Sequence, residues 1–335
     1  MAKNYYCPGF FENAIMYREL EYYRRHFPDT FVDNAKITHV YGCFPSCIWN
    51  GGGCWVSIPA QRYIIRDCLN WWKNETEVII QLTFTNPIVV ETDIYDRYSN
   101  AILDVAVETL GYDRLEVLVS SPILEKYIRE KYPNINITKS IIGMTGDEKQ
   151  CVSIADYVEQ LNIYPKIVIP RKKVNDKDFI LNFPQELKNK VELLCTDPCD
   201  INCPRLYSHY KDMAKEQLWE EVSKERTYCS LFTPNEPYRM TKYLIYQVTP
   251  AEVEAYEALG WSEFKISGRV SSSMAPLQVV PYLVKPEYSK DLLYNIYTAI
   301  YGEDAVIPHP SFWNDPIPRE LYDYSQEKLN VNNEI

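Results

Sequence analysis

Closely spaced cysteines are the residues of this sequence with the clearest chemical potential. The 335-residue chain holds 10 cysteines, and Cys195, Cys199 and Cys203 recur at four-residue spacing, with Cys229 further along. Three thiolates in one loop can wrap a single metal centre, and a fourth completes a tetrahedral set. The first residues of the chain lack the pattern of an export signal, so we expect reduced thiols rather than disulfides.

The cysteine run leaves the identity of the metal open. Cys203 is followed by Pro204, as in some iron-sulfur binding runs, which favours a [4Fe-4S] cluster. Zinc also takes four thiolates, although its sites usually use paired cysteines on ribbons and turns. A third interpretation is that these thiols bind no metal. The C-x₃-C-x₂-C pattern of radical SAM enzymes is absent, because Asn202 stands where its last cysteine would be.

A second group of thiols surrounds a glycine-rich turn. Cys43, Cys47 and Cys54 enclose Asn50 and the glycines at 51–53. Glycine lets the backbone approach a ligand closely or adopt a positive φ, so one interpretation is a substrate loop with Asn50 as a polar contact. The alternative is a tight turn with buried thiols. Any of these three cysteines could instead be the fourth metal ligand.

Short β-branched runs alternate with helical patterns, which indicates repeated βα units. Ser121 and Pro122 have the residue types that begin a helix, and Gly111 the type that ends one. Strands are predicted at 37–41, 78–84, 115–119, 137–142, 166–169, 191–194 and 264–266, with one more at either 230–232 or 243–246.

About eight βα units in about 250 residues match a closed (β/α)₈ barrel of the TIM type. The predicted fold class is therefore α/β, as a single barrel domain over residues 1–335 with its core at about 37–285. Residues 1–36 and 286–335 are expected to be short extensions. An open doubly wound sheet is the alternative, but it would usually carry a glycine-rich phosphate loop after its first strand, and none occurs here.

Because active sites of such barrels lie at the C-terminal ends of the strands, further candidates can be selected. His209 lies on the predicted helix that leaves the cysteine run. It is a candidate acid or base, or a donor to a cluster sulfur, with a capping or surface position as the alternative. Asn86 and Arg171 end the second and fifth predicted strands and are candidate substrate contacts. His39 lies inside the first predicted strand, where a hydrogen-bonded interior histidine is expected.

Composition disfavours several classes of partner. The formal charge is −11, from 35 Lys and Arg against 46 Asp and Glu, which disfavours nucleic acid. The apolar runs are far shorter than the ~20 residues of a membrane span, so no membrane partner is expected. We expect a cytoplasmic protein with a small-molecule substrate, and leave open whether it forms a homo- or heterodimer.

The stretch from Val248 to Arg269 resembles a known family. It reads V-T-P-A-E-V-E-A-Y-E-A-L-G-W-S-E-F-K-I-S-G-R and is similar to the collagenase-like peptidase family U-32, where a helix, a glycine and a strand of the form (L/F)-K-I-E-G-R close the barrel. Ser267 stands where that family usually has Glu. The run Cys199-x₃-Cys203-Pro-x-Arg205 also resembles the cluster-bearing branches of the family, although their longer E-x-F-x₂-G signature is missing.

The resemblance covers mainly residues 190–285. It implies a barrel with a four-cysteine iron-sulfur centre and, rather than proteolysis, oxygen-independent hydroxylation of an aromatic ring or an RNA base with an organic oxygen donor. Cys199, Cys203 and Cys229 match the family's ligands, and Cys195 is our choice for the fourth.

Lys265 and Arg269 match the closing strand of that family. At the end of the last strand they would put two cations at the barrel mouth, where they could hold a carboxylate or phosphate and share catalysis with His209. The alternative is a buried ion pair that ties the last strand to the first. Arg205, beside the cysteine run, is a further candidate substrate contact.

The sequence thus predicts an iron-sulfur barrel enzyme that acts on a small anionic or aromatic metabolite. The alternatives are an RNA-base-modifying enzyme of the same family, a zinc-dependent lyase or hydrolase, and a non-catalytic subunit with a structural cluster.

Overall fold

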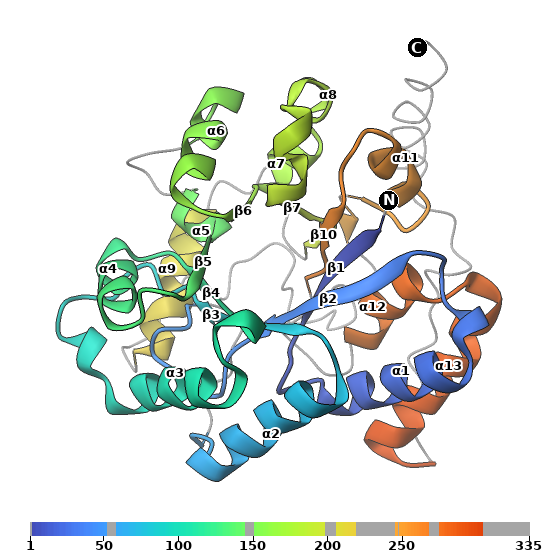
Figure 1. The fold of residues 1–335 in the computed structure, drawn as a ribbon, viewed down its shortest axis with the longest axis horizontal. Helices are drawn as coiled ribbons and strands as arrows, with labels where there is room; N and C mark the ends of the chain where they lie inside the picture. The colour runs from blue at the N-terminus through green and yellow to red at the C-terminus, as the bar shows by residue number, and fades with distance from the viewer. Residues whose placement is uncertain are drawn as a thin grey trace, which may run out of the picture.

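Eight parallel strands close into a barrel, as the sequence predicts (Figure 1). The computed structural model describes residues 2–51, 58–144, 151–197, 206–218, 245–246, 248–267 and 275–303. Around the barrel the strand order is β1, β10, β7, β6, β5, β4, β3 and β2, so that neighbours in the barrel follow one another along the chain. This arrangement confirms the (β/α)₈ architecture.

The elements follow one another in βα order. The barrel strands are β1 (Lys3–Pro8), β2 (Ala35–Gly42), β3 (Ile79–Phe84), β4 (Leu115–Val119), β5 (Asn136–Lys139), β6 (Lys166–Val168), β7 (Val191–Leu194) and β10 (Glu263–Lys265). The helices are α1 (Ala14–His26), α2 (Arg62–Glu75), α3 (Arg97–Leu110), α4 (Pro122–Lys131), α5 (Ile141–Met144), α6 (Ile154–Ile163), α7 (Arg171–Val174), α8 (Lys177–Asn182), α9 (Leu206–Gln217), α11 (Val253–Ala258), α12 (Ala275–Leu283) and α13 (Pro286–Tyr301). Short 3₁₀ turns lie at Pro28–Thr30, Asp93–Tyr95, Tyr112–Arg114 and Gln185–Lys190.

The barrel begins at β1, inside the segment that the sequence analysis took as an extension. β1 is hydrogen-bonded to β2 on one side and to β10 on the other, so this strand closes the barrel. It replaces the eighth strand expected at 230–232 or 243–246. Residues 245–246 form β9, which pairs antiparallel with β8 (Thr196–Asp197) in a separate two-stranded sheet. Residues 230–232 lie outside the described part of the chain.

The C-terminal end of the described chain also belongs to the helical layer. α13 packs against α1 and α12, and Figure 1 shows α1 and α13 side by side beneath the barrel. The segment 286–301 therefore covers the barrel, whereas the sequence analysis placed it in an extension.

Alternation along the strands sends apolar side chains outward and polar ones inward. On β3, Ile80, Leu82 and Phe84 belong to the apolar core between barrel and helices, whereas Gln81 and Thr83 bond to other interior residues. The outer apolar layer therefore holds the helices in place, and the interior is left free for polar chemistry.

Helix ends follow the residue types read from the sequence. Ser121 Oγ accepts a hydrogen bond from the Leu124 N–H at 3.4 Å, and Pro122 occupies the first turn of α4. α3 ends at Gly111, which has a φ of +72°. These caps fix where the chain enters and leaves β4.

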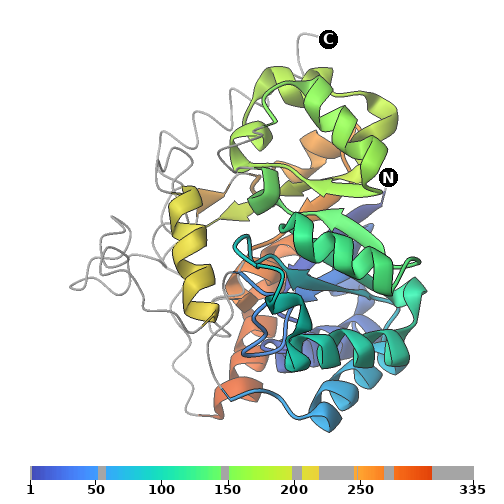
Figure 2. The ribbon, with the colours of Figure 1, turned by 90° about the vertical axis from the view of Figure 1, so that its left-hand side faces the viewer.

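Helix α9 stands at one side of the barrel in Figure 2, where it is drawn in yellow. Among the described residues, none of the helices combines the length and the apolar character that crossing a membrane requires.

Candidate functional site in the barrel interior

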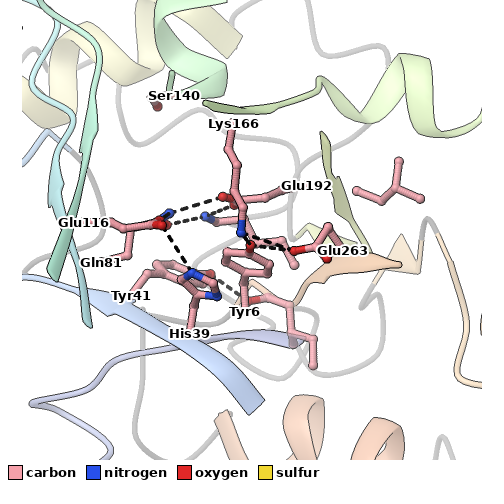
Figure 3. A network of polar contacts seen from close by, with 12 residues as sticks. Tyr6, His39, Tyr41, Gln81, Glu116, Ser140, Lys166, Glu192 and Glu263 are labelled. Carbon is pink, nitrogen blue, oxygen red and sulfur yellow. Dashed lines mark hydrogen bonds and ion pairs between the residues drawn. The ribbon is translucent and has the colours of Figure 1, made fainter. Parts of the chain in front are cut away.

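Charged and polar side chains fill the barrel interior, where barrels of this type usually hold bulky branched apolar residues (Figure 3). We call these residues the interior network. Burying charges costs free energy unless they are paired and hydrogen-bonded, so the pairing decides whether the fold tolerates them. The members of the interior network are Asn4, Tyr6, His39, Tyr41, Gln81, Glu116, Lys166, Glu192, Glu263 and Lys265.

Lys265 and Glu192 form the central ion pair of this network. Lys265 Nζ lies 2.6 Å from Glu192 Oε2, and the two side chains are 5% and 0% exposed. The same ammonium donates to Gln81 Oε1 at 2.8 Å and lies 4.3 Å above the ring of Tyr41. The carboxylate, the amide oxygen and the aromatic face together offset the free-energy cost of burying this ammonium.

Gln81 joins the two sides of the interior network. Its Nε2 donates to Glu192 Oε1 at 3.2 Å and to Glu116 Oε2 at 3.4 Å. On the far side, Glu116 Oε1 lies 3.5 Å from His39 Nε2. A continuous line of polar contacts therefore runs from Lys265 on β10 to His39 on β2. Figure 3 shows Gln81, Glu116, Glu192 and His39 converging along this line.

Glu116 is held in its ionised form by its neighbours. Burial raises the pKa of this carboxyl, but the neighbouring His39, the charge of Lys166 and the hydrogen bond from Gln81 together bring the pKa below its ordinary value. His39 also stacks on Tyr6 at a ring separation of 4.1 Å. As expected from the sequence, His39 is a buried interior histidine, and its Nδ1 lies 3.0 Å from Thr38 Oγ1.

A second ion pair closes the network toward the start of β10. Tyr6 Oη donates to Glu263 Oε2 at 2.7 Å, and Asn4 Nδ2 donates to Glu263 Oε1 at 2.6 Å. Lys166 Nζ lies 3.4 Å from Glu263 Oε2 and bonds to Tyr6 Oη. Because Glu263 precedes Lys265 on the same strand, this second pair lies nearer the N-terminal end of the barrel.

Toward the other end of the barrel, the polar lining changes from charged groups to hydroxyls. Thr85 follows β3, Ser120 follows β4, and Thr138 faces inward from β5, because its neighbours Ile137 and Lys139 reach the outer core and Glu125 of α4. Among the described residues, the buried hydroxyls of Thr85, Ser120 and Thr138 have no hydrogen-bond partner. Buried hydroxyls without a protein partner are uncommon in folded proteins, where water or a ligand usually supplies the hydrogen bond.

Arg171 follows a barrel strand at this end, whereas His209 belongs to a separate helix. Arg171 follows β6 after two residues and begins α7, with only 1% of its surface exposed. It is a buried cation just beyond the C-terminal end of β6. His209 lies on α9 and is half-buried.

The loop after β2 is held against the loop after β3. Asn86 Nδ2 donates to the Ile48 carbonyl at 2.7 Å, and Asn86 Oδ1 accepts from the Ile88 N–H at 3.0 Å. A methyl group on Gly51 would overlap the backbone of residue 86. Asn86 therefore holds backbone rather than pointing to a ligand, whereas Asn50 accepts a hydrogen bond from Thr83 Oγ1 at 3.0 Å on the interior side.

Lys265 corrects one sequence prediction. Rather than standing at the mouth to meet a substrate anion, its ammonium is buried in the interior network and paired with Glu192. The buried ion pair considered as the alternative is present, but it ties the last barrel strand to β7 and not to the first strand. Residue 265 faces the barrel interior, so its side chain meets the Glu192 carboxylate. Glu192 was not among the residues selected from the sequence.

Cys195 does not fit a metal ligand at the barrel mouth. Its Sγ contacts the Leu193 carbonyl oxygen at 3.5 Å within the apolar core, and burial raises the pKa of this thiol well above its ordinary value. Among the described residues, no three His, Cys, Asp or Glu side chains are grouped so that they could hold a metal ion.

Cys199, Cys203, Arg205, Cys229 and Arg269 lie outside the described part of the chain.

Sequence reasoning missed the acidic half of the site. Gln81, Glu116 and Glu192 each stand inside a predicted strand, flanked on both sides by apolar residues: I-I-Q-L, L-E-V-L and V-E-L-L. A polar residue at an inward position of a buried barrel strand must have a partner. A polar residue flanked by apolar residues inside a predicted strand was therefore the signal that could have identified these three residues.

The comparisons add one distant likeness. No family model matches the chain, and no curated protein matches it. Among solved structures, the chain is similar to one described as "The Structure of the U32 Peptidase Mk0906". The identity is 12%, the TM-score is 0.48, and the match covers 80% of this chain and 94% of that chain. That structure is named for the family that residues 248–269 resemble. A likeness this distant assigns neither an activity nor a ligand to the chain.

Proposed function

We propose that this protein is an enzyme that binds a small anionic metabolite at the C-terminal end of its barrel. The observation that carries the proposal is the set of buried hydroxyls of Thr85, Ser120 and Thr138, which have no partner among the described residues. Leaving such a group without a hydrogen bond costs about 1–3 kcal/mol. Three of them on neighbouring strands, at the end where barrel enzymes bind their substrates, support a ligand that supplies the missing bonds.

Arg171 supports the anionic character of that ligand. It begins α7, directly after β6, the strand next to the one that carries Thr138, and its side chain is buried at the same end of the barrel. A guanidinium can donate two parallel hydrogen bonds to a carboxylate or phosphate, and such charge-assisted bonds are the strong ones.

Lys265 and Glu192 would handle protons in the proposed reaction. Lys265 is the charged member of the network placed furthest along β10, and Glu192 Oε2 accepts its hydrogen bond at 2.6 Å. When the ammonium gives a proton to a bound substrate, the carboxylate and Gln81 remain to hold the amine in place. Lys265 is therefore retained as the candidate catalytic residue, in an interior position.

Calorimetric titration of small anions tests the binding step. The probes are a panel of two- to four-carbon carboxylates and simple phosphate monoesters, titrated into the wild-type protein and into Arg171→Gln. We expect at least one probe to bind, and its affinity to fall about tenfold or more in the variant, since a charge-assisted bond is worth about 1.5–3 kcal/mol. The matched control is Arg62→Gln, because Arg62 pairs with Glu108 on the surface. Equal affinity in Arg171→Gln and Arg62→Gln would contradict the proposal.

A second measurement separates a ligand-binding hydroxyl from a structural one. Ser120→Ala removes a buried group without a partner. We expect the thermal midpoint of the ligand-free protein to stay the same or rise, while the affinity for the anion falls. A lower thermal midpoint with unchanged affinity would instead make Ser120 a packing residue.

The cysteine run supports a second candidate, an iron-sulfur enzyme that hydroxylates a small anionic or aromatic metabolite without oxygen. It rests on Cys199, Cys203 and Cys229, with their spacing in the sequence. Since Cys195 is a core residue, the fourth ligand would come from elsewhere, and Cys54 is an alternative that the sequence offers. Bound in this way, a [4Fe-4S] cluster would supply electrons, whereas zinc in the same thiolates would supply Lewis acidity.

Metal analysis decides between an iron-sulfur cluster and zinc at these thiolates. Anaerobic purification should give a coloured protein with iron and sulfide, and Cys199→Ala should lose most of the metal. Cys195→Ala and Cys151→Ala should keep it. A colourless protein loaded with zinc would replace the cluster by the zinc-dependent alternative, and metal retained in Cys199→Ala would remove this site.

A further inference from the structure

Two apolar residues depart from the rule that apolar strand residues of this barrel face outward. Leu118 of β4 and Val168 of β6 are 5% and 1% exposed, yet neither belongs to the apolar core between the barrel and the helices. Their sequence neighbours on both sides do belong to that core, namely Val117, Val119, Ile167 and Ile169. Since successive side chains of a strand point to opposite faces, Leu118 and Val168 face the barrel interior.

The strand registers place these two side chains in one layer of the barrel interior. In a barrel of this type, a layer consists of side chains from alternate strands, and the strands are staggered by about one residue each. The paired residues of neighbouring strands, followed around the barrel in this way, give a layer of Tyr41, Leu118, Val168 and Lys265. The 4.3 Å between the Lys265 ammonium and the Tyr41 ring agrees with this arrangement. The ammonium of this layer therefore shares it with one aromatic and two aliphatic side chains.

Two of the buried hydroxyls without a partner border Leu118. Ser120 lies two residues further along the chain, just after β4, and Thr138 is the residue paired with Leu118 on β5. A strand rises about 3.3 Å per residue, so Ser120 lies roughly 7 Å beyond the level of Leu118. A ligand that bonds to the hydroxyls of both Ser120 and Thr138 therefore passes along the Leu118 side chain.

We propose that Leu118, Val168 and Tyr41 bind the apolar body of the ligand and thereby determine its chemical class. The inference rests on the proposed anion site, and it adds that the anionic group is joined to an aliphatic or aromatic body rather than to a polyhydroxylated one. The anionic group lies beside Arg171 and Ser120, and the apolar body extends inward across Leu118 and Val168.

This layer selects its ligand through the free energy of desolvation. Carbon atoms that leave water for the surfaces of Leu118 and Val168 gain free energy in proportion to the apolar area that is buried. Hydroxyl groups in the same place lose their hydrogen bonds to water, and the two aliphatic side chains offer neither a donor nor an acceptor in exchange. Both effects favour an apolar body over a polyhydroxylated one.

Calorimetric titration of matched anions into the whole protein tests the inference. The probes are propyl phosphate with glycerol 1-phosphate, and hexanoate with gluconate, because each pair shares its anionic group and chain length and differs in hydroxyl groups. We expect the apolar member of at least one pair to bind about tenfold or more tightly than its partner. In Val168→Thr, which keeps the shape of the side chain, this ratio should fall about threefold or more. The matched control is Ile167→Val, which shortens the neighbouring outward side chain and should leave the ratio unchanged.

The anion site and the apolar selection fail in different ways. Equal affinity within each pair, weakened for both members in Arg171→Gln, would leave the anion site in place and overturn the apolar selection. If no probe binds the wild-type protein, the anion site is refuted and the selection with it. An unchanged ratio in Val168→Thr would overturn the role of Val168 in selection and make it a packing residue. Thermal unfolding of each variant ensures that the ratios describe the folded protein.

Discussion

Lys265 and Glu192 carry opposite charges inside the barrel, so removing one of them leaves the other charge buried without a partner. We expect Lys265→Met to lower the free energy of unfolding by about 3–5 kcal/mol, the usual effect of leaving one buried charge without its partner. The measurement is urea unfolding followed by circular dichroism. A loss of less than about 1 kcal/mol would mean that water reaches the Glu192 carboxylate.

The double variant Lys265→Met with Glu192→Leu separates charge from packing. Because the desolvation cost of both charges disappears together, we expect the double variant to be more stable than Lys265→Met alone. If the pair serves catalysis, as we propose, this variant should be folded and inactive. Equal stability of the single and double variants would contradict the pairing.

The pH dependence of stability should report on Glu116. Its pKa in the folded state lies below its ordinary value of about 4.3, so it binds its proton less readily folded than unfolded. Its ionised form therefore contributes stability above the unfolded pKa, and this contribution is lost as the pH falls through the folded pKa. We expect the wild type to be more stable than Glu116→Gln at about pH 5, and this difference in stability to disappear by about pH 3, as measured by thermal unfolding. A constant difference over that interval would contradict the shift.

Residue type and position in the sequence identified some members of the candidate site. Lys265, Arg171 and Asn50 were found because they stand at predicted strand ends or beside glycines. Asn86 was found in the same way, but its amide holds the backbone of Ile48 and Ile88. Whether an amide meets a ligand or a neighbouring loop depends on contacts between segments distant in sequence, and a single sequence does not contain them.

At the scale of elements, the loop after β2 depends on close backbone contact with the loop after β3. Gly51 lies against the backbone of residues 85 and 86, whereas Gly111 has open space around it and requires only a positive φ. We expect backbone strain in Gly111→Ala to lower the free energy of unfolding by ~1 kcal/mol. Gly51→Ala should lower it by more, because the two loops must separate to make room for the methyl group. Chemical unfolding of both variants checks the order, and the reverse order would mean that this contact is easily relieved.

The βα pattern between residues 37 and 194 was readable because each strand is a β-branched run bounded by turn residues. Six of the predicted strands correspond to β2 to β7. The pattern failed for β1, whose sequence K-N-Y-Y-C-P contains no β-branched residue. Its strand geometry comes from pairing with β2 and β10, at separations of about 30 and 260 residues, and tertiary pairing of this kind overrides local propensity.

At the scale of the whole molecule, closure of the barrel rests on that N-terminal strand. β1 supplies Asn4 and Tyr6 to the interior network and Tyr5 to the outer core, where its ring packs on Phe264. Without it, β2 and β10 would both present unpaired edges, and Glu263 would lose two hydrogen-bond donors. Every layer of the fold therefore uses this strand.

Removing residues 1–9 should abolish the folded barrel, whereas a dispensable extension would leave it intact. We expect the truncated chain to aggregate or to lose cooperative thermal unfolding, as followed by circular dichroism and size-exclusion chromatography. A synthetic peptide of residues 1–12 should restore cooperative unfolding, because the strand pairs through backbone hydrogen bonds to both neighbours. The same peptide with Tyr5→Ser and Tyr6→Ser should restore less, since these side chains fill the outer core and bond to Glu263. A truncated chain that unfolds at the wild-type temperature would show that the barrel closes without β1.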